Sequence, residues 1–200
     1  MTTPVYILIR TSGRPRFFKA MMASIKAQTY RKIITIVHTD NPGDTYVWGD
    51  IIVRGTPKPG CRAPYNLYMN TLIKAVCKQD PGWVYMLDDD DALAAPDVIA
   101  RFVAASKIDH INVARADRGH GKIWPKKWRI QTSFQTECFM LWSKYSGMGK
   151  WWGKTGGDHY YTKQITRALP INWIDGLIVA RAQAGKSRGA RRDLGERRGR

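Results

Sequence analysis

The chain has 200 residues and a formal net charge of +17, from 33 Lys and Arg against 16 Asp and Glu. Its length fits one domain, and its three cysteines form no C-x-x-C pair, which argues against a disulfide framework and against a zinc site. No apolar stretch reaches the roughly 18–20 residues that span a bilayer, and the first residues lack the pattern of a signal peptide. We therefore expect a cytoplasmic protein whose positive charge attracts a phosphate-bearing partner.

Short apolar runs alternate with helical periodicity through the first half of the chain. The runs predict strands at 5–9, 33–37, 50–53 and 83–87, and the periodic segments predict helices at 16–28, 65–78 and 96–106. This alternation predicts an α/β sheet with helices on both faces. Because ligands of such sheets bind beyond the carboxyl ends of the strands, we expect the strand ends near residues 11, 40 and 88 to converge on one crevice.

The second half of the chain is less regular. We expect strands at 110–113, 137–142 and 171–178, a helix at 160–168, a basic aromatic segment at 121–129 and a glycine-rich loop at 151–159. From residue 181 onward apolar content falls and basic residues dominate, which predicts a disordered basic tail. The chain therefore divides into one domain, 1–180, with halves at 1–106 and 107–180, and a tail at 181–200.

Four consecutive aspartates follow the apolar run at 83–87: Asp88, Asp89, Asp90 and Asp91. Carboxylates crowded at the end of a buried strand repel one another unless a cation offsets them. Hard oxygen ligands of this kind suit Mn²⁺ or Mg²⁺, so the run indicates a metal that holds a diphosphate. The alternative is a solvated acidic turn that caps the next helix. An EF-hand loop is excluded, because Leu93 and Ile99 stand where it needs Gly and Glu.

The ordered motifs of the first hundred residues resemble the family 2-type glycosyltransferases of the GT-A fold. A strand leads into Thr11 and Arg14-Pro15, and a helix ends in the stretch 24–30, which is similar to the family's S-x-x-x-Q-T-Y pattern. The next strand ends at Asp40, and the run at 88–91 matches the family's D-x-D region. The resemblance implies a single α/β domain with a GT-A-like, Rossmann-like mixed sheet flanked by helices.

The resemblance also implies a site for a nucleotide-sugar donor, most simply a UDP-sugar. Its donor-binding residues would be Thr11, Arg14, Pro15, Asp40, Arg62, Asn66, Asp88 and Asp89. Asp90 would ligate the metal, and Asp91 would be a second ligand or an orienting group. His159 is either a further metal or diphosphate ligand or a packing residue.

A general base is also implied, in a loop that follows a glycine-rich stretch. Gly156-Gly157-Asp158 looks like that loop, although the family often has a Glu-Asp pair where Gly157 precedes Asp158 here. Glu137 is a rival for the base. The implied reaction is metal-dependent sugar transfer to a hydroxyl, with inversion because no second carboxylate nucleophile is evident. A sugar nucleotidyltransferase is disfavoured, since the turn after the first strand has one glycine only.

The charge of +17 exceeds what a donor with two phosphates needs, so the acceptor is expected to be a polyanion. We favour DNA with a 5-hydroxymethylpyrimidine, as in phage-type DNA glycosyltransferases, because basic residues neutralise phosphates and aromatic rings stack on a displaced base. The acceptor residues would be Trp124, Lys126, Lys127, Trp128, Trp151 and Trp152. The alternatives are a surface polysaccharide or lipid-linked glycan, and a non-catalytic nucleic-acid-binding protein on a transferase scaffold.

Overall fold

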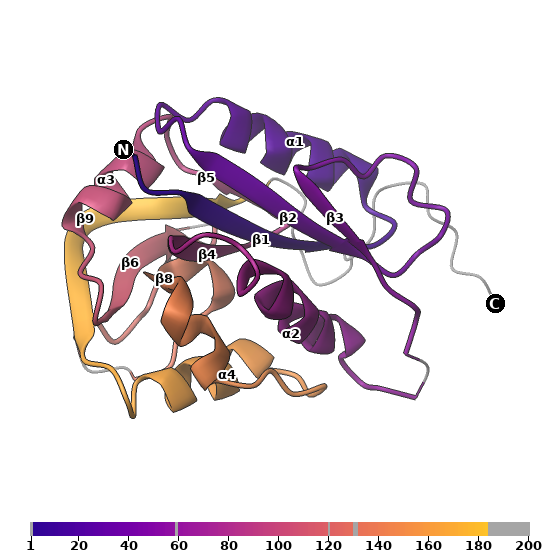
Figure 1. Cartoon of the computed structure of the whole chain (residues 1–200). Helices are drawn as coiled ribbons and strands as arrows, with labels where there is room; N and C mark the ends of the chain where they lie inside the picture. Colours follow the sequence, from indigo (N-terminus) through magenta and orange to yellow (C-terminus); the bar gives the residue numbers. More distant parts are fainter. Residues whose placement is uncertain (1, 59, 120, 130–131, 184–200) are drawn as a thin grey trace.

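One mixed sheet organises the computed structural model, which describes residues 2–58, 60–119, 121–129 and 132–183 (Figure 1). Its strands are β1 Val5–Thr11, β2 Ile33–Thr39, β3 Ile51–Arg54, β4 Trp83–Asp88, β5 Asp91–Leu93, β6 Ile111–Asp117, β7 Ile123–Trp124, β8 Phe139–Trp142 and β9 Ile171–Ala182. They run in the order β3-β2-β1-β4-β8-β6-β9-β5, and β7 pairs with β6. The helices are α1 Pro15–Lys26, α2 Pro64–Val76, α3 Val98–Ala105 and α4 Gly157–Ile165, with the 3₁₀ helices η1 Thr136–Cys138 and η2 Ser143–Met148. The predicted mixed α/β sheet flanked by helices is confirmed.

The first half of the chain builds the parallel part of the sheet. β1 lies between β2 and β4 and pairs in parallel with both, and β2 pairs in parallel with β3. Every residue from Val5 to Ile9 is buried, as expected of a central strand that is covered on both faces. Figure 1 shows α1 above the sheet and α2 below it. The carboxyl ends of β1, β2 and β4 therefore meet at one edge.

α1 shows how the sequence specifies its own placement. Pro15 stands in the first turn, where a missing N–H costs nothing. The apolar positions that we predicted are the buried face: Phe17, Phe18, Met21, Met22 and Ile25. The opposite face exposes Lys19 and Lys26. No described helix combines the length and the apolar character needed to cross a membrane.

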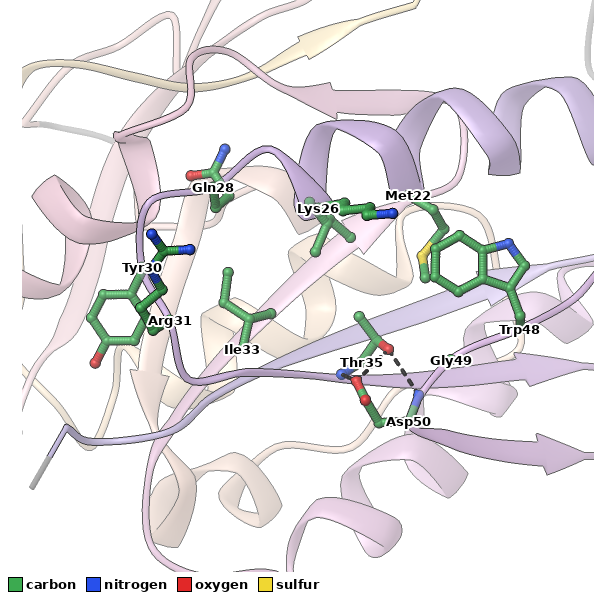
Figure 2. A pocket seen from close by; sticks show the side chains of 11 residues that line it. Met22, Lys26, Gln28, Tyr30, Arg31, Ile33, Thr35, Trp48, Gly49 and Asp50 are labelled. Carbon is green, nitrogen blue, oxygen red and sulfur yellow. Dashed lines mark hydrogen bonds between the residues drawn. The ribbon is translucent and has the colours of Figure 1, made fainter.

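The segment from Trp48 to Asp50 is tied to β2 (Figure 2). Asp50 Oδ2 accepts hydrogen bonds from the N–H and the Oγ1 of Thr35 at 2.7 and 2.8 Å, and the Asp50 N–H donates to Thr35 Oγ1 at 3.0 Å. A Cβ at Gly49 would lie 2.7 Å from Val37 Cγ2, so glycine is needed for this close approach. Trp48 is consequently held at the surface, 50% exposed.

Some boundaries differ from the sequence-based expectation. Asp91 begins β5, which pairs antiparallel with β9, so the acidic run enters a short strand before the next helix. The prediction that Glu137 lies in a strand is wrong, because it lies in the 3₁₀ turn that leads into β8. β9 continues to Ala182, past the expected tail boundary at 181, because its last residues pair with β5. Residues 184–200 of the expected tail lie outside the described residues.

Candidate functional site

A cavity of about 530 Å³ opens beyond the carboxyl ends of β1, β2 and β4. It receives side chains from both halves of the chain, in the place where α/β sheets commonly bind ligands. Carboxylic acids and arginines dominate its lining: Asp40, Asp88, Asp89, Asp90, Glu137 and Asp158, with Arg10, Arg14 and Arg118. The strand ends therefore converge on one crevice, as the alternation predicted.

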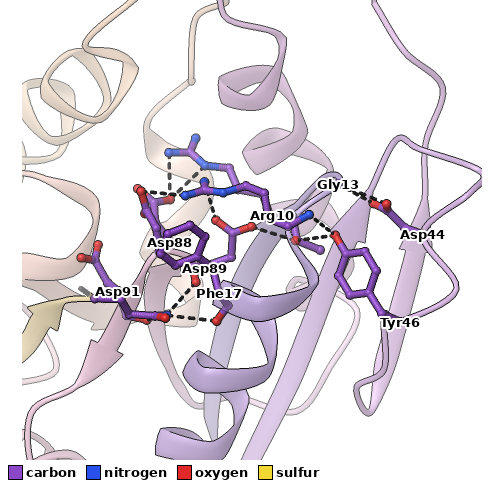
Figure 3. Close-up of polar contacts among 12 residues, drawn as sticks. Arg10, Gly13, Phe17, Asp44, Tyr46, Asp88, Asp89 and Asp91 are labelled. Carbon is purple, nitrogen blue, oxygen red and sulfur yellow. Dashed lines mark hydrogen bonds and ion pairs between the residues drawn. The ribbon is translucent and has the colours of Figure 1, made fainter. Parts of the chain in front are cut away.

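Arg10 holds Asp88 at the last position of β4 (Figure 3). The two residues are partners in the parallel register, and Nε and Nη2 of Arg10 lie 3.0 and 2.9 Å from Asp88 Oδ1. Nη1 of Arg10 donates to Asn66 Oδ1 at 2.8 Å. Its guanidinium carbon lies 5.0 and 5.6 Å from the ring centroids of Tyr65 and Trp151. These contacts fix both the arginine and the carboxylate at the cavity wall.

Arg14 bridges the next two aspartates. Its Nη1 lies 2.7 Å from Asp89 Oδ1, and its Nη2 lies 2.9 Å from Asp90 Oδ2. Thr11 Oγ1 donates to Asp89 Oδ2 at 2.8 Å, so both oxygens of Asp89 have partners. Burial raises the pKa of Asp89 to about 7, and the positive charge of Arg14 opposes that rise. Asp89 thus serves chiefly to anchor Arg14 and Thr11 around the acidic run.

The backbone of the acidic run is anchored from the far end of β9. Nε2 of Gln183 lies 3.0, 2.9 and 3.1 Å from the carbonyl oxygens of Phe17, Asp89 and Asp91. The N–H of Gln183 donates to the Asp90 carbonyl at 3.0 Å. These bonds hold the carboxylates in place before any ligand arrives, which is how a binding site avoids an ordering cost.

Asp88, Asp91 and Glu137 each place a carboxylate oxygen within 4.8 Å of the other two. Asp91 and Glu137 are buried, whereas Asp88 is partly exposed and lines the cavity. Arg118 is ion-paired with Glu137, and its Nη1 lies 4.0 Å from Asp91 Oδ2, so the arginine offsets part of the negative charge of the three carboxylates. Hard oxygen donors at this separation fit Mn²⁺ or Mg²⁺. The donor set therefore suits the divalent metal that the sequence suggested.

Asp158 lines the same cavity from the first turn of α4. Gly156 precedes the helix at φ 78°, a left-handed conformation that favours glycine, and it turns the chain into α4. Burial raises the pKa of Asp158, with a further contribution from Asp88, while His159 and Arg10 oppose the rise. A carboxylate with a raised pKa is a stronger proton acceptor, which suits a general base.

Gly157 stands where the family resemblance leads one to expect glutamate, and packing accounts for the difference. A Cβ at this position would lie 2.6 Å from Asn66 Cγ. The Asn66 amide is not free to move, because its Nδ2 donates to the Lys154 carbonyl at 2.6 Å and its Oδ1 accepts from Arg10. A larger side chain at 157 would displace Asn66 and, through it, Arg10.

The structure brings most of the expected donor-binding residues to the cavity: Thr11, Arg14, Asp40, Asn66, Asp88 and Asp89. Pro15 begins α1 directly after them in the chain. Arg62 is exposed and does not line the cavity. His159 does not line it either, and its Nδ1 lies 3.1 Å from Ser133 Oγ.

The two neighbouring tryptophans of the glycine-rich loop have different environments. Trp151 is fully buried and stacks on Tyr161, with ring centroids 5.0 Å apart. Trp152 is exposed and stacks on Tyr160 at 5.9 Å. Trp151 therefore belongs to the core, and Trp152 is the ring of this pair that a ligand can reach.

The basic aromatic segment lies outside the cavity lining. Trp124 and Trp128 are half-buried and pack against the core. Trp128 Nε1 donates to Asp175 Oδ1 at 2.7 Å. Lys126 and Lys127 are exposed. The segment is thus a surface feature rather than a wall of this cavity.

Sequence reasoning missed three residues that shape the site. Arg10 had a signal, since a charged residue that ends an otherwise apolar strand lies at the strand edge where ligands bind. Arg118 had no such signal, because its partners Glu137 and Asp91 are 19 and 27 positions away in sequence and are brought to it only by the folded sheet. Gln183 was placed in the tail, beyond the expected end of the last strand.

No protein-family model and no curated protein matches the chain. The mannosyltransferase PcManGT from Pyrobaculum calidifontis, solved in complex with GDP-Man and Mn²⁺, is similar with a TM-score of 0.68 at 16% identity, over 94% of this chain and 59% of that one. S. aureus TarS is similar with a TM-score of 0.67 at 12% identity, over 91% of this chain and 37% of that one. TarS 1-349, solved in complex with UDP, is similar with a TM-score of 0.67 at 13% identity, over 91% of this chain and 61% of that one.

The chain spans 37% to 61% of the length of these proteins, so the likeness concerns one part of each. At identities of 12% to 16% it is a likeness of fold. The chain has the GT-A fold of these glycosyltransferases.

Proposed function

We propose that this protein transfers a sugar from a nucleotide-sugar donor, most simply a UDP-sugar, to a hydroxyl acceptor. The observation that carries the proposal is the cavity at the sheet edge, where the acidic run, its arginines and Asp158 meet. Two structural neighbours support it, since PcManGT is in complex with GDP-Man and Mn²⁺ and TarS 1-349 is in complex with UDP.

Asp88, Asp91 and Glu137 would hold a divalent cation, Mn²⁺ or Mg²⁺, because their oxygens already lie close together. When bound, such an ion offsets the negative charge that grows on the departing diphosphate. Asp90, the ligand that the family resemblance implies, is ion-paired with Arg14 through Oδ2, so it would share its negative charge between Arg14 and the metal.

The other residues of the cavity supply positioning and proton transfer. Thr11 and Asp40, at the ends of β1 and β2, would contact the base and ribose, and Arg14 would shift toward the phosphates. Asp158 would accept the proton of the acceptor hydroxyl. Glu137 is the weaker base, because Arg118 neutralises it. The acceptor oxygen would bond to the anomeric carbon as the bond to the diphosphate breaks, and this single displacement inverts the sugar.

We propose DNA that contains a 5-hydroxymethylpyrimidine as the acceptor. The hydroxymethyl group supplies the hydroxyl, and the net charge of +17 favours association with phosphates. The exposed side chains of Lys126, Lys127 and Trp152 provide charge and a stacking face outside the cavity.

The enzymatic part of the proposal is tested by hydrolysis of nucleotide sugars in the presence of Mn²⁺. We expect turnover that EDTA abolishes and that Asp88→Asn reduces to background, because this change removes a carboxylate that lines the cavity. Asp97→Asn, at an exposed position beside α3, is the matched control and should retain full turnover. Absence of metal-dependent turnover with a full panel of nucleotide sugars would contradict the proposal.

The acceptor is tested separately with radiolabelled donor. Label should appear in DNA that contains hydroxymethylcytosine, and not in ordinary DNA of the same sequence. Label that appears only in polysaccharide or in lipid-linked glycan would refute the DNA acceptor and leave the sugar transfer itself in place.

A further inference from the structure

A second cavity, of about 440 Å³, lies between α1, the beginning of β2 and the segment from Trp48 to Asp50 (Figure 2). We call it the α1–β2 groove. Met22 and Ile33 contribute apolar surface to it. Trp48 stands at one end in Figure 2 and Arg31 at the other, with Lys26 on the helix between them.

The groove is distinct from the catalytic cavity. It includes Ile33, the first residue of β2, whereas the catalytic cavity lies beyond Thr39 at the other end of this strand. Six steps of about 3.3 Å separate these two residues, so Ile33 and Thr39 lie roughly 20 Å apart along the sheet. No residue lines both cavities.

The groove borders a segment of the chain whose charged residues are all positive. From residue 13 to residue 39 the sequence has six Lys and Arg and no Asp or Glu. Lys26 and Arg31 are exposed, and neither forms an ion pair with another described residue. The carboxylate of Asp50 also borders the groove and accepts two hydrogen bonds from Thr35, and its one negative charge is outnumbered by the two cations. The potential here is therefore positive and favours an anion.

The groove also presents a fixed aromatic face. Trp48 packs edge-on against Phe18, with ring centroids 6.2 Å apart, and Gly49 and Asp50 hold its backbone against β2. Half of the indole is nevertheless exposed. A ring held in this way offers stacking at a small conformational cost.

We propose that the α1–β2 groove binds an unpaired stretch of nucleic acid, with one base on Trp48 and neighbouring phosphates at Lys26 and Arg31. Cations that track a backbone beside an aromatic platform are the usual features of single-strand binding. A paired duplex offers no free base face, and an anionic glycan offers no π face. The inference rests on the proposed DNA acceptor, since the groove would hold a strand on the protein while a nearby nucleotide occupies the catalytic cavity.

The test is the binding of a labelled oligothymidylate, followed by fluorescence anisotropy in a salt titration. Trp48→Ala should weaken binding roughly 5- to 150-fold, because it removes one stacking platform. Trp48→Phe should restore most of the affinity. Lys26→Ser with Arg31→Ser should weaken binding and lower the salt slope by about 1.4, the value for two phosphate contacts with a single strand.

The matched control is Lys74→Ser with Lys78→Ser. These lysines are exposed at and just beyond the end of α2, on the opposite side of the sheet, and their loss changes the net charge by the same amount. The control pair should leave the slope close to that of the wild type. Heparin is the second probe, because it has charge but no bases, and Trp48→Ala should not affect its binding.

Wild-type affinity of Trp48→Ala for the oligothymidylate would overturn the inference, and so would an equal loss of heparin binding. The outcome is separable from the proposed function. If the protein glycosylates DNA but the groove variants bind the oligothymidylate as the wild type does, the proposed role of the groove is refuted and the proposed activity stands. If the groove variants bind more weakly but the wild type glycosylates no DNA, the nucleic-acid site in the groove is supported and the proposed DNA acceptor is refuted.

Discussion

Arg14 and a divalent metal compete for the same negative charge. The arginine makes ion pairs of 2.7 and 2.9 Å with Asp89 and Asp90, so a metal that Asp90 ligates would share the charge of this carboxylate with Arg14. Coupling of this kind between two ligands of one group is typically worth about a fivefold change in affinity or more. Replacing the arginine should therefore strengthen metal binding even as it weakens the grip on the donor phosphates.

We expect Arg14→Gln to bind Mn²⁺ at least about five times more tightly than the wild type in the absence of nucleotide. Electron paramagnetic resonance of free Mn²⁺ in a titration measures this directly. Arg101→Gln removes an exposed arginine of α3 and should leave the affinity unchanged. Equal affinities in Arg14→Gln and the wild type would contradict this competition for charge.

Asp158 sets the pH at which the protein works, if it is the base. We expect Asp158→Asn to lower kcat by about 10²- to 10⁴-fold while the affinity for UDP is retained, since a base contributes to proton transfer and not to donor binding. Wild-type kcat should fall as the pH drops through the pKa of Asp158, which burial raises above the ordinary aspartate value. If kcat does not fall until the pH reaches the ordinary pKa range of aspartate, Asp158 is not the base.

The contact between α4 and α2 couples Asp158, the proposed base, to the proposed donor side of the cavity. Gly157 abuts Asn66, and Asn66 holds Arg10, which in turn holds Asp88. We expect Gly157→Ala to raise the KM for donor, because the added Cβ forces Asn66 away from Arg10. Asn66→Ala combined with Gly157→Ala should be no worse than Gly157→Ala alone, since both changes break the same chain of contacts. Additive losses in the double variant would contradict this account.

At the scale of elements, the sequence predicts the long buried strands best. β1 and β4 appear as continuous apolar runs because both of their faces are covered. β5 could not be predicted, because a strand of three residues has no period to detect and its partner in β9 lies about ninety positions away. The cluster of Asp88, Asp91 and Glu137 could not be predicted either, because Glu137 is distant in sequence from the two aspartates. Glu137 in η1 reaches the acidic run only through the pairing of β8 with β4. Motif spacing could locate the acidic run and Asp158, but not the arginines that neutralise them.

At the scale of the whole molecule, charge is unevenly distributed along the chain. Residues 184–200 carry seven Lys and Arg against two acids. We expect a chain that ends at residue 183 to bind duplex DNA more weakly and with a shallower salt dependence, because fewer counterions are released. Filter binding at several salt concentrations measures the slope. A slope equal to that of the full chain would show that these residues make no phosphate contacts.

The catalytic cavity has the opposite sign from the molecule that contains it. Its six carboxylic acids outnumber its three arginines, in a protein of net charge +17. We expect this cavity to disfavour a dianionic nucleotide sugar that arrives alone, and to favour its electrically neutral chelate with Mn²⁺. We expect initial rates to follow the concentration of the chelate, and excess free donor to be a poor ligand rather than a competitor. The cavity would then select its substrate by net charge before any atom of the sugar is recognised.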